Sequence, residues 1–463
     1  MRLCYQLIRQ WFWALPLLVL PISAFFFAPG LEIEADNLKY MGIAWSMQET
    51  GNYLVPFANG VPYTDKPPLL FWMILACWHV FGINAVGLQC LVSLLLGAWI
   101  VMTKATYSVI FPEDNTGKTL LPYLMIGSFA ILDYAHFLHV DLFLVTGVLL
   151  TNLGICKRLH ASFARSNLYI VLGVFIGLFA KGPVIYVFTL LPFFMSMLLH
   201  QSYRAHFLKI IGLVMMGTAL FLMAWVVPVI FMTSHEFLQQ ILYKQVANRA
   251  TFVDDKTHFF YLLKLPYLLL PWSLAILFIR KFSNAVTEVW RRDVFVIAII
   301  VMGVAVLSFF GQKRFWYLLP CIPYCMIILT RFFVVNTPRF LRWIKIASIS
   351  AALLFATISP YYFSLIENSF QLKLMKQVFS EQKTKGNGVV MLSNGGPIYL
   401  FNYFAKMHFI ATLNSATDMQ QWLVLHPRGI VIVHAKQCPE PLHLVLYTHE
   451  MHYALCQSIA SPA

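Results

Sequence analysis

Long apolar segments joined by short basic loops constrain the fold of this chain more than any other feature. Of its 463 residues, 60% are hydrophobic and 11% are charged, and the mean hydropathy is +0.72. A soluble domain carries about 25% charged residues, so the sequence predicts an all-α polytopic membrane protein. The candidate spans are 11–28, 85–103, 119–133, 138–155, 167–180, 184–199, 207–231, 261–279, 293–310, 316–332 and 343–363.

The basic residues of the connecting loops predict the orientation. Threading the chain with its N-terminus inside places most lysines and arginines in inner loops, which hold few acids. This positive-inside pattern is typical of inner-membrane proteins and explains the net charge of +14 better than nucleic-acid binding does. The first span is expected to be a retained helix, because no small-x-small cleavage site follows it.

Two regions are expected outside the membrane. The first outer loop, about 29–84, contains Leu38, Met41 and Trp45 on one face of a helix, then an apolar helix from Pro68 to Phe81 that is too short to span. From residue 364 the composition changes. We therefore predict a transmembrane domain over 1–363 and a small α/β domain over 364–463, with strands at 388–392 and 429–433 and helices at 397–407 and 415–425.

Six charged residues from distant parts of the chain fall at one membrane face in this threading. Acids and bases gathered at a membrane boundary indicate a site for a phosphate-bearing lipid, because intramembrane charges usually face a cavity or a partner. The six residues are Asp36, Lys66, Asp141, Lys181, Arg249 and Lys313.

Two of these cations stand next to prolines. Lys66 precedes Pro67 and Pro68, and Lys181 precedes Gly182 and Pro183, so each is expected beside a helix N-terminus. A lysine at the positive end of a helix dipole suits an anion such as a diphosphate. The alternative is that each lysine extends along the helix end toward water.

The two acids have simpler alternatives as well. Asp36 could be a helix N-cap. Asp141 has apolar neighbours on both sides, and with His136 and His139 nearby a metal site is conceivable, although the spacing is not distinctive. Cys438 and Cys456 could form a disulfide if the C-terminal part is extracytoplasmic, or remain unpaired thiols.

Taken in order, these motifs resemble the C-type membrane glycosyltransferases, the family of the aminoarabinose lipid A transferases and the dolichyl-phosphate-mannose protein mannosyltransferase-like enzymes. The resemblance covers about residues 30–330. It is carried by Asp36–Tyr40, Gly60–Pro68, Asp141, Ala180–Pro183, Pro271–Ser273 and Lys313–Pro320.

The resemblance implies a periplasm-facing enzyme of the bacterial inner membrane that takes a sugar from a polyprenyl-phosphate donor and gives it to lipid A or another envelope glycan. Asp36 and Asp141 would be its catalytic carboxylates. No cofactor would be required, although a divalent metal is possible. The donor would be bound by Tyr63, Asp65, Lys66, Lys181, Arg249, Lys313 and Tyr317.

Other functions stay open. Protein O-mannosylation fits the same resemblance, and a transporter fits the charged membrane segments. A non-enzymatic assembly or sensor protein would use the C-terminal domain to bind partners, but that role does not require the cations of the membrane part. The sequence also departs from the family pattern at Asn37, where an acid is common, and at Lys244–Val246, where the aminoarabinose branch tends to have acids and a histidine. These departures bear on the sugar and the acceptor, not on the fold.

Overall fold

The computed structural model divides, by contacts between residues, into two compact units. The first contains 1–26, 64–70 and 89–357, and the second contains 27–63, 71–88 and 358–463. The second unit therefore takes in parts of the first outer loop as well as the C-terminal region. The structure describes residues 31–32, 35–160, 165–232, 239, 259–277, 279–311, 313–370, 372–384, 388–392, 399–407, 409–434, 438–440, 442–448 and 453–458.

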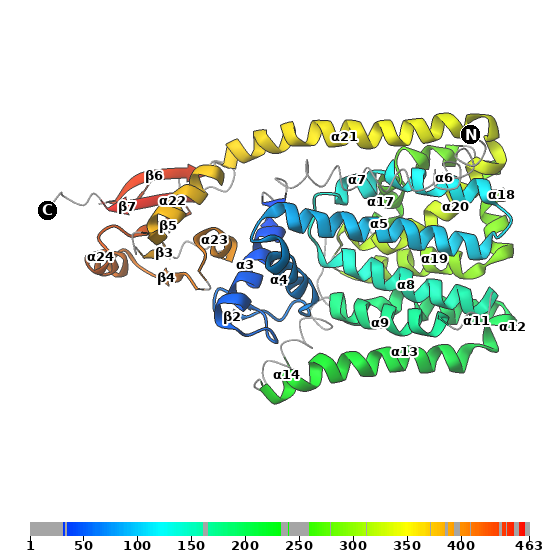
Figure 1. The fold of residues 1–463 in the computed structure, drawn as a ribbon, viewed down its shortest axis with the longest axis horizontal. Coiled ribbons are helices and arrows are strands. Elements are labelled where there is room, and N and C mark those ends of the chain that lie inside the picture. The colour runs from blue at the N-terminus through cyan, green and yellow to red at the C-terminus, as the bar shows by residue number, and fades with distance from the viewer. Residues whose placement is uncertain are drawn as a thin grey trace. The chain divides into compact units, whose positions relative to one another are not determined.

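Helices build the first unit, and several of them run side by side (Figure 1). They are α5 (Ala85–Ile110), α6 (Asn115–Ile126), α7 (Phe129–Tyr134), α8 (Val140–His160), α9 (Ser166–Lys181), η2 (Gly182–Val184), α10 (Ile185–Phe188), α11 (Leu190–Leu199), α12 (Gln201–Arg204), α13 (Phe207–Phe221), η3 (Leu222–Val226), α14 (Val227–Met232), α17 (Phe260–Leu268), η5 (Trp272–Leu277), α18 (Ile279–Arg292), α19 (Val294–Phe309), η6 (Phe315–Cys321), α20 (Ile322–Asn336) and η7 (Pro338–Phe340). Helix α21 (Leu341–Phe370) begins in this unit and continues into the second.

Glycines let α8 and α9 approach closely. A Cβ atom added at Gly147 would lie 2.7 Å from the Gly173 carbonyl oxygen and 2.8 Å from the Gly177 Cα. Small residues at such contacts are typical of membrane helices, which associate through van der Waals packing because lipid supplies no hydrophobic drive. The close contact fixes the register between α8 and α9, and this register positions the residues at their ends.

In the described residues, six helical stretches are long and apolar enough to cross a membrane, or seven if the α18–α19 pair, bent by 113°, counts as one. These stretches confirm a multi-pass protein, but they do not confirm the predicted count of eleven spans. The expected first span, 11–28, lies outside the described residues.

The longest stretch, Ser166–Leu199, reverses direction at its middle. Lys181 ends α9 beside Asp141 at the start of α8, whereas Phe188 accepts a hydrogen bond from Asn152, further along α8. The stretch is therefore a hairpin, as the predicted break at Lys181–Pro183 requires.

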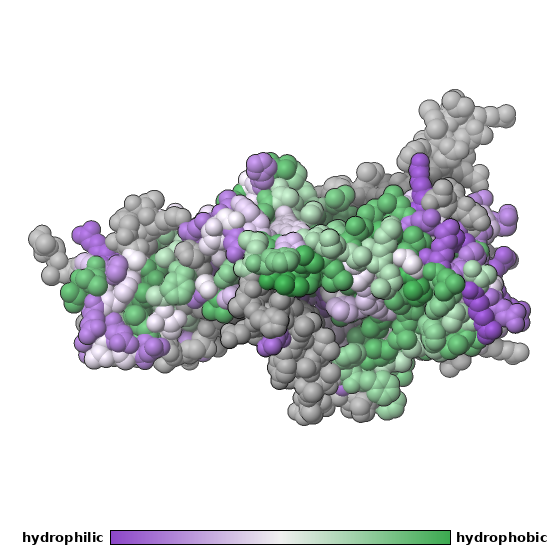
Figure 2. Space-filling view, turned by 90° about the horizontal axis from the view of Figure 1, so that it is seen from below, coloured by the Kyte–Doolittle hydropathy of each residue, from purple (hydrophilic) through white to green (hydrophobic). Residues whose placement is uncertain are grey.

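The polar loops gather at one end of this unit. Figure 2 shows a hydrophobic surface over the helical region and hydrophilic residues at the end where α12 and α18 lie in Figure 1. The contacts agree, because Asp293 at the start of α19 binds both His160 at the end of α8 and Tyr203 in α12. We call this the basic end. The predicted inner loops meet here, which supports the alternating thread.

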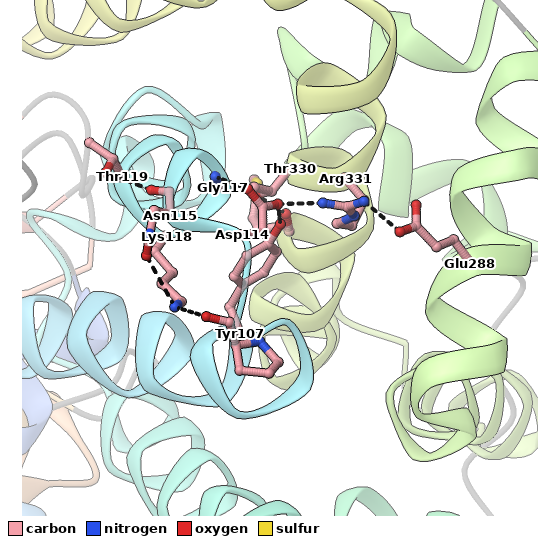
Figure 3. Close-up of polar contacts among 11 residues, drawn as sticks. Tyr107, Asp114, Asn115, Gly117, Lys118, Thr119, Glu288, Thr330 and Arg331 are labelled. Atoms are coloured by element: carbon pink, nitrogen blue, oxygen red, sulfur yellow. Dashed lines mark hydrogen bonds and ion pairs between the residues drawn. The ribbon is translucent and has the colours of Figure 1, made fainter.

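An ion-pair cluster joins three helices at the basic end (Figure 3). Arg331 of α20 pairs with Asp114 in the α5–α6 loop and with Glu288 of α18, and Tyr107 of α5 donates to Asp114 over 2.5 Å. Burial alone would raise the pKa of Asp114. The pKa is nevertheless below its ordinary value, because Tyr107 and the Gly117 N–H donate hydrogen bonds to the carboxylate and Arg331 supplies a positive charge. The cluster therefore stabilises the packing of α18 and α20 when Asp114 is ionised.

The second unit combines two helices of the first outer loop with a small mixed sheet. Its elements are α3 (Ala35–Thr50), β1 (Phe57–Ala58), β2 (Val61–Pro62), α4 (Leu69–Phe81), α22 (Leu372–Thr384), β3 (Val389–Leu392), α23 (Tyr399–Ala405), β4 (Ala411–Leu413), α24 (Ala416–Leu425), β5 (Ile430–Val433), β6 (Leu442–Thr448) and β7 (Tyr453–Ser458). Leu38 and Met41 are buried along α3, but Asn37, Ile43 and Ser46 are buried as well, so burial extends around most of the helix and not along the single face that the spacing predicts.

The five-stranded sheet has the order β4-β3-β5-β7-β6. Strand β3 pairs in parallel with β4 and β5, and β7 is antiparallel to β5 and β6. The predicted strands at 388–392 and 429–433 and both predicted helices are confirmed. A disulfide joins Cys438 to Cys456.

Polar contacts join the first outer loop to the C-terminal region inside this unit. The Asn59 amide donates to the Ile410 carbonyl over 3.1 Å, and Glu32 pairs with Lys376 and accepts a hydrogen bond from Tyr403 over 3.1 Å. Burial, followed by the charge of Glu32, raises the pKa of the Tyr403 phenol well above its ordinary value, so this side chain stays neutral. The loop and the C-terminal region therefore form one folded body.

Candidate functional site

Asp141 is the most deeply buried acid of the predicted site. It lies in the first turn of α8 and its side chain is 0% exposed. A buried carboxylate needs a compensating charge and hydrogen bonds. Lys181 supplies the charge with its Nζ 2.5 Å from Asp141 Oδ1, and His139 Nδ1 lies 2.6 Å from Oδ2.

The end of α9 brings Lys181 to this position. Gly182 adopts a left-handed φ of +66°, which an L side chain rarely adopts, and Pro183 follows it. The helix therefore ends at Lys181, whose side chain is 4% exposed. Its ammonium also lies 4.2 Å from the centre of the Tyr317 ring of η6, within the range of a cation–π interaction.

The same 3₁₀ segment contributes a second aromatic contact. The Trp316 ring lies 6.1 Å from the His139 ring, centre to centre, and Lys313, just before η6, is 4% exposed. Helices α8 and α9 and segment η6 thus bring one acid, basic groups and aromatic rings together at the end of the bundle opposite the basic end. We call Asp141, His139, Lys181 and Tyr317 the buried ion-pair site.

Asp36 lies in the second unit, with a different lysine. Its carboxylate is 2.8 Å from Lys39 Nζ, one turn along α3, and its side chain is 43% exposed. Lys39 also lies 5.2 Å from the Tyr40 ring centre and 6.0 Å from that of Tyr63. Asp36 is in the first turn of α3, where the helix dipole favours an acid. This group, Asp36, Lys39 and Tyr63, is more accessible than the buried ion-pair site.

For three other predicted residues, Asp65, Lys66 and Arg249, the structure gives at most the degree of burial. Asp65 and Lys66 are partly buried and precede α4, which begins at Leu69 as the prolines predict. Arg249 lies outside the described residues. Within the part of the chain that is described, no group of three or more His, Cys, Asp or Glu side chains is placed to hold a metal ion. The catalytic and binding roles of these residues stay predictions.

Sequence reasoning missed two residues that contact the predicted site residues, Lys39 and Trp316. Lys39 follows Asp36 by three residues, a spacing that places both on one helix face, so its contact could have been found from the sequence. The contact between Trp316 and His139 could not, because it depends on how η6 packs against the start of α8.

Comparisons with known proteins agree with the fold. No protein-family profile matches the chain. An undecaprenyl phosphate-α-4-amino-4-deoxy-L-arabinose arabinosyl transferase of Pseudomonas fluorescens is 26% identical over 332 residues, 67% of this chain and 56% of that protein. The chain thus matches little more than half the length of this relative. A transferase with the same description from an Enterobacter species is 23% identical over 88% of this chain and 72% of its own length.

A solved structure shares the fold of nearly the whole chain. The crystal structure of ArnT from Cupriavidus metallidurans bound to undecaprenyl phosphate superposes with a TM-score of 0.78, covering 96% of this chain and 98% of that one at 13% identity. Sequence similarity and fold together confirm the resemblance of this chain to the C-type membrane glycosyltransferases of the aminoarabinose lipid A transferase type.

Proposed function

We propose that this protein is a glycosyltransferase that moves a sugar from a polyprenyl-phosphate donor to lipid A at the periplasmic face of the inner membrane. The observation that carries the proposal is the buried ion-pair site at one end of a bundle whose fold matches that of a transferase bound to undecaprenyl phosphate. Two relatives named as undecaprenyl phosphate-aminoarabinose arabinosyl transferases support the donor class.

The orientation rests on two features that agree. Basic loops meet at the end of the bundle opposite the buried ion-pair site, which the positive-inside rule assigns to the cytoplasm. The Cys438–Cys456 disulfide in the second unit fits an oxidising compartment such as the periplasm. Both features favour a periplasmic reaction.

In the proposed reaction, the bond between the anomeric carbon of the sugar and the donor phosphate oxygen breaks. Its electron pair stays on the polyprenyl phosphate, and an acceptor oxygen forms the new bond to the carbon with inversion. Lys66, Arg249 and Lys313 are proposed to stabilise the negative charge that grows on the leaving phosphate. The reaction needs no nucleotide, because the donor is already activated.

The role of Asp36 depends on the acceptor. A phosphate of lipid A is already ionised, so Asp36 would stabilise positive charge developing on the sugar or orient the acceptor. A hydroxyl acceptor would instead give its proton to Asp36 as a general base. Lys39 Nζ, 2.8 Å from the Asp36 carboxylate, would hold it in position in either case.

Asp36→Asn tests the proposal with purified protein in lipid nanodiscs, a polyprenyl-phosphate sugar and lipid A. We expect transfer to fall by at least about 100-fold. Glu49→Gln is the matched control, because it removes one acid from the other end of α3 and should leave transfer unchanged. Wild-type transfer by Asp36→Asn would rule out its catalytic role, and the absence of any product from the wild-type protein with this donor class would refute the proposed function.

A further inference from the structure

A polar cavity lies at the basic end of the first unit, far along α8 from the buried ion-pair site. Its volume is about 250 Å³. Four segments form its walls: the end of α8, the chain from 200 to 206, the end of α18 and the start of α19. The lining residues that matter here are His160, His200, His206, Arg291, Arg292 and Asp293.

Asp293 holds these walls together. Its Oδ1 atom accepts hydrogen bonds from the Tyr203 hydroxyl at 2.6 Å and the Phe295 N–H at 3.0 Å, and its Oδ2 atom lies 3.0 Å from His160 Nε2. The carboxylate is 0% exposed. An ionised carboxylate only accepts hydrogen bonds, so this acid is satisfied by the wall itself.

The other titratable side chains of the lining, apart from Tyr203, are basic. Of the described residues around the cavity, Asp293 is the only acid, whereas three are histidines and two are arginines. Arg291 and Arg292 are exposed at the end of α18. With Asp293 already partnered by groups of the wall, the side chains that face the cavity favour an anion. Arginine forks match phosphate oxygens in particular.

The size and the place of the cavity narrow the ligand class. It is smaller than the roughly 300–1,000 Å³ of pockets for drug-sized ligands, so it suits a headgroup and not a whole glycolipid. Trp290, 39% exposed, also lines it, and tryptophan side chains favour the membrane–water interface. Basic pockets between membrane helices are known to bind anionic lipid headgroups.

The geometry points to a binding site for an anionic phosphodiester headgroup at the basic end, separate from the proposed reaction site. A bound headgroup would join α18 to α8 and the 200–206 segment through charge-assisted hydrogen bonds. The site does not depend on the proposed transferase activity, since none of its residues takes part in that mechanism.

Native mass spectrometry of the full chain with added cardiolipin tests this site, with zwitterionic phosphatidylcholine as the reference lipid. The double variant Arg291→Gln/Arg292→Gln should bind cardiolipin about 30-fold more weakly, because each cation near an anionic lipid contributes a factor of about five. The matched control is Arg339→Gln/Arg342→Gln, which removes two exposed arginines outside the cavity. The control should keep the wild-type preference for cardiolipin.

Competition with inorganic phosphate separates a lipid from a soluble source. If phosphate binding, but not cardiolipin binding, is lost in the double variant, the site takes soluble phosphoryl groups and the headgroup assignment is overturned. Equal loss in the double variant and in the control would overturn the site itself. His206→Asn provides a second variant on another wall, and unchanged cardiolipin affinity in both this variant and the arginine pair would refute the proposal.

Discussion

Breaking the Asp141–Lys181 pair should destabilise the protein more than replacing both partners together. The two side chains are 0% and 4% exposed, and the charged atoms are 2.5 Å apart. At an effective dielectric constant of 20, their Coulomb attraction is about 7 kcal/mol, most of which offsets the cost of burying two charges. Removing one partner leaves the other charge buried, and this costs about 3–5 kcal/mol.

Lys181→Met and Asp141→Asn should each lower the free energy of unfolding by about 3–5 kcal/mol. The loss for Lys181→Met includes its contact with the Tyr317 ring, worth up to about 2 kcal/mol when desolvated. The double variant Asp141→Asn/Lys181→Met buries no unpaired charge, so it should recover at least half of the sum of the two losses. Reversible unfolding of the variants in mixed detergent micelles measures all three values.

The same variants separate structural from chemical roles. If Asp141 and Lys181 only hold α8 against α9, the refolded double variant should regain transfer along with stability. If either residue contacts the substrate, the double variant should fold and remain inactive. Additive losses in the cycle would refute the reasoning, because they would mean that the two side chains do not compensate each other. Ser93→Ala, a buried hydroxyl on α5, is a control for general disturbance of the core.

Three further predictions concern the basic end and the second unit. Arg331→Met should lower the free energy of unfolding by about 3 kcal/mol, because it leaves Asp114 and Glu288 without their shared partner. Urea titration in micelles measures this loss. A loss below about 1 kcal/mol would show that the cluster behaves as a solvent-exposed ion pair. The folded-state pKa of Asp114 is lowered, so the contribution of Asp114 to stability is complete above about pH 4 and declines as the pH falls through the folded-state pKa. The free energy of unfolding, measured against pH, should show this decline in the wild type and a smaller decline in Asp114→Asn. Cys438→Ser/Cys456→Ser should destabilise the sheet of the second unit by about 3 kcal/mol. Limited proteolysis should then cut the sheet faster while the membrane helices stay protected. Equal protection of the sheet with and without the disulfide would contradict the predicted destabilisation.

Much of the architecture could be predicted because its signals are local. Apolar runs reveal membrane helices wherever they stand, since each helix satisfies its own backbone hydrogen bonds. The break after Lys181 follows from Gly182 and Pro183, whose backbone preferences do not depend on the rest of the fold. The α/β character of the C-terminal region follows from its short apolar runs at 388–392 and 429–433.

The partners of the charged residues could not be predicted in the same way. Sequence reasoning treated Asp141 and Lys181 as separate members of a site, whereas the structure joins them as one pair. Forty residues separate them, and their contact depends on the register of α8 against α9, which is set by how closely Gly147 and Gly173 let the helices approach.

Hydropathy, proline and glycine in the sequence alone therefore determined that this chain crosses a membrane several times, where its helices break and that a small sheet follows them. Only the tertiary structure decided which acid neutralises which base, and that Asn59 in the first outer loop binds Ile410 in the C-terminal region. The physical reason is that hydropathy and backbone preference act over a few residues, whereas an ion pair or a cross-chain hydrogen bond forms only when packing fixes two distant segments within about 3 Å of each other.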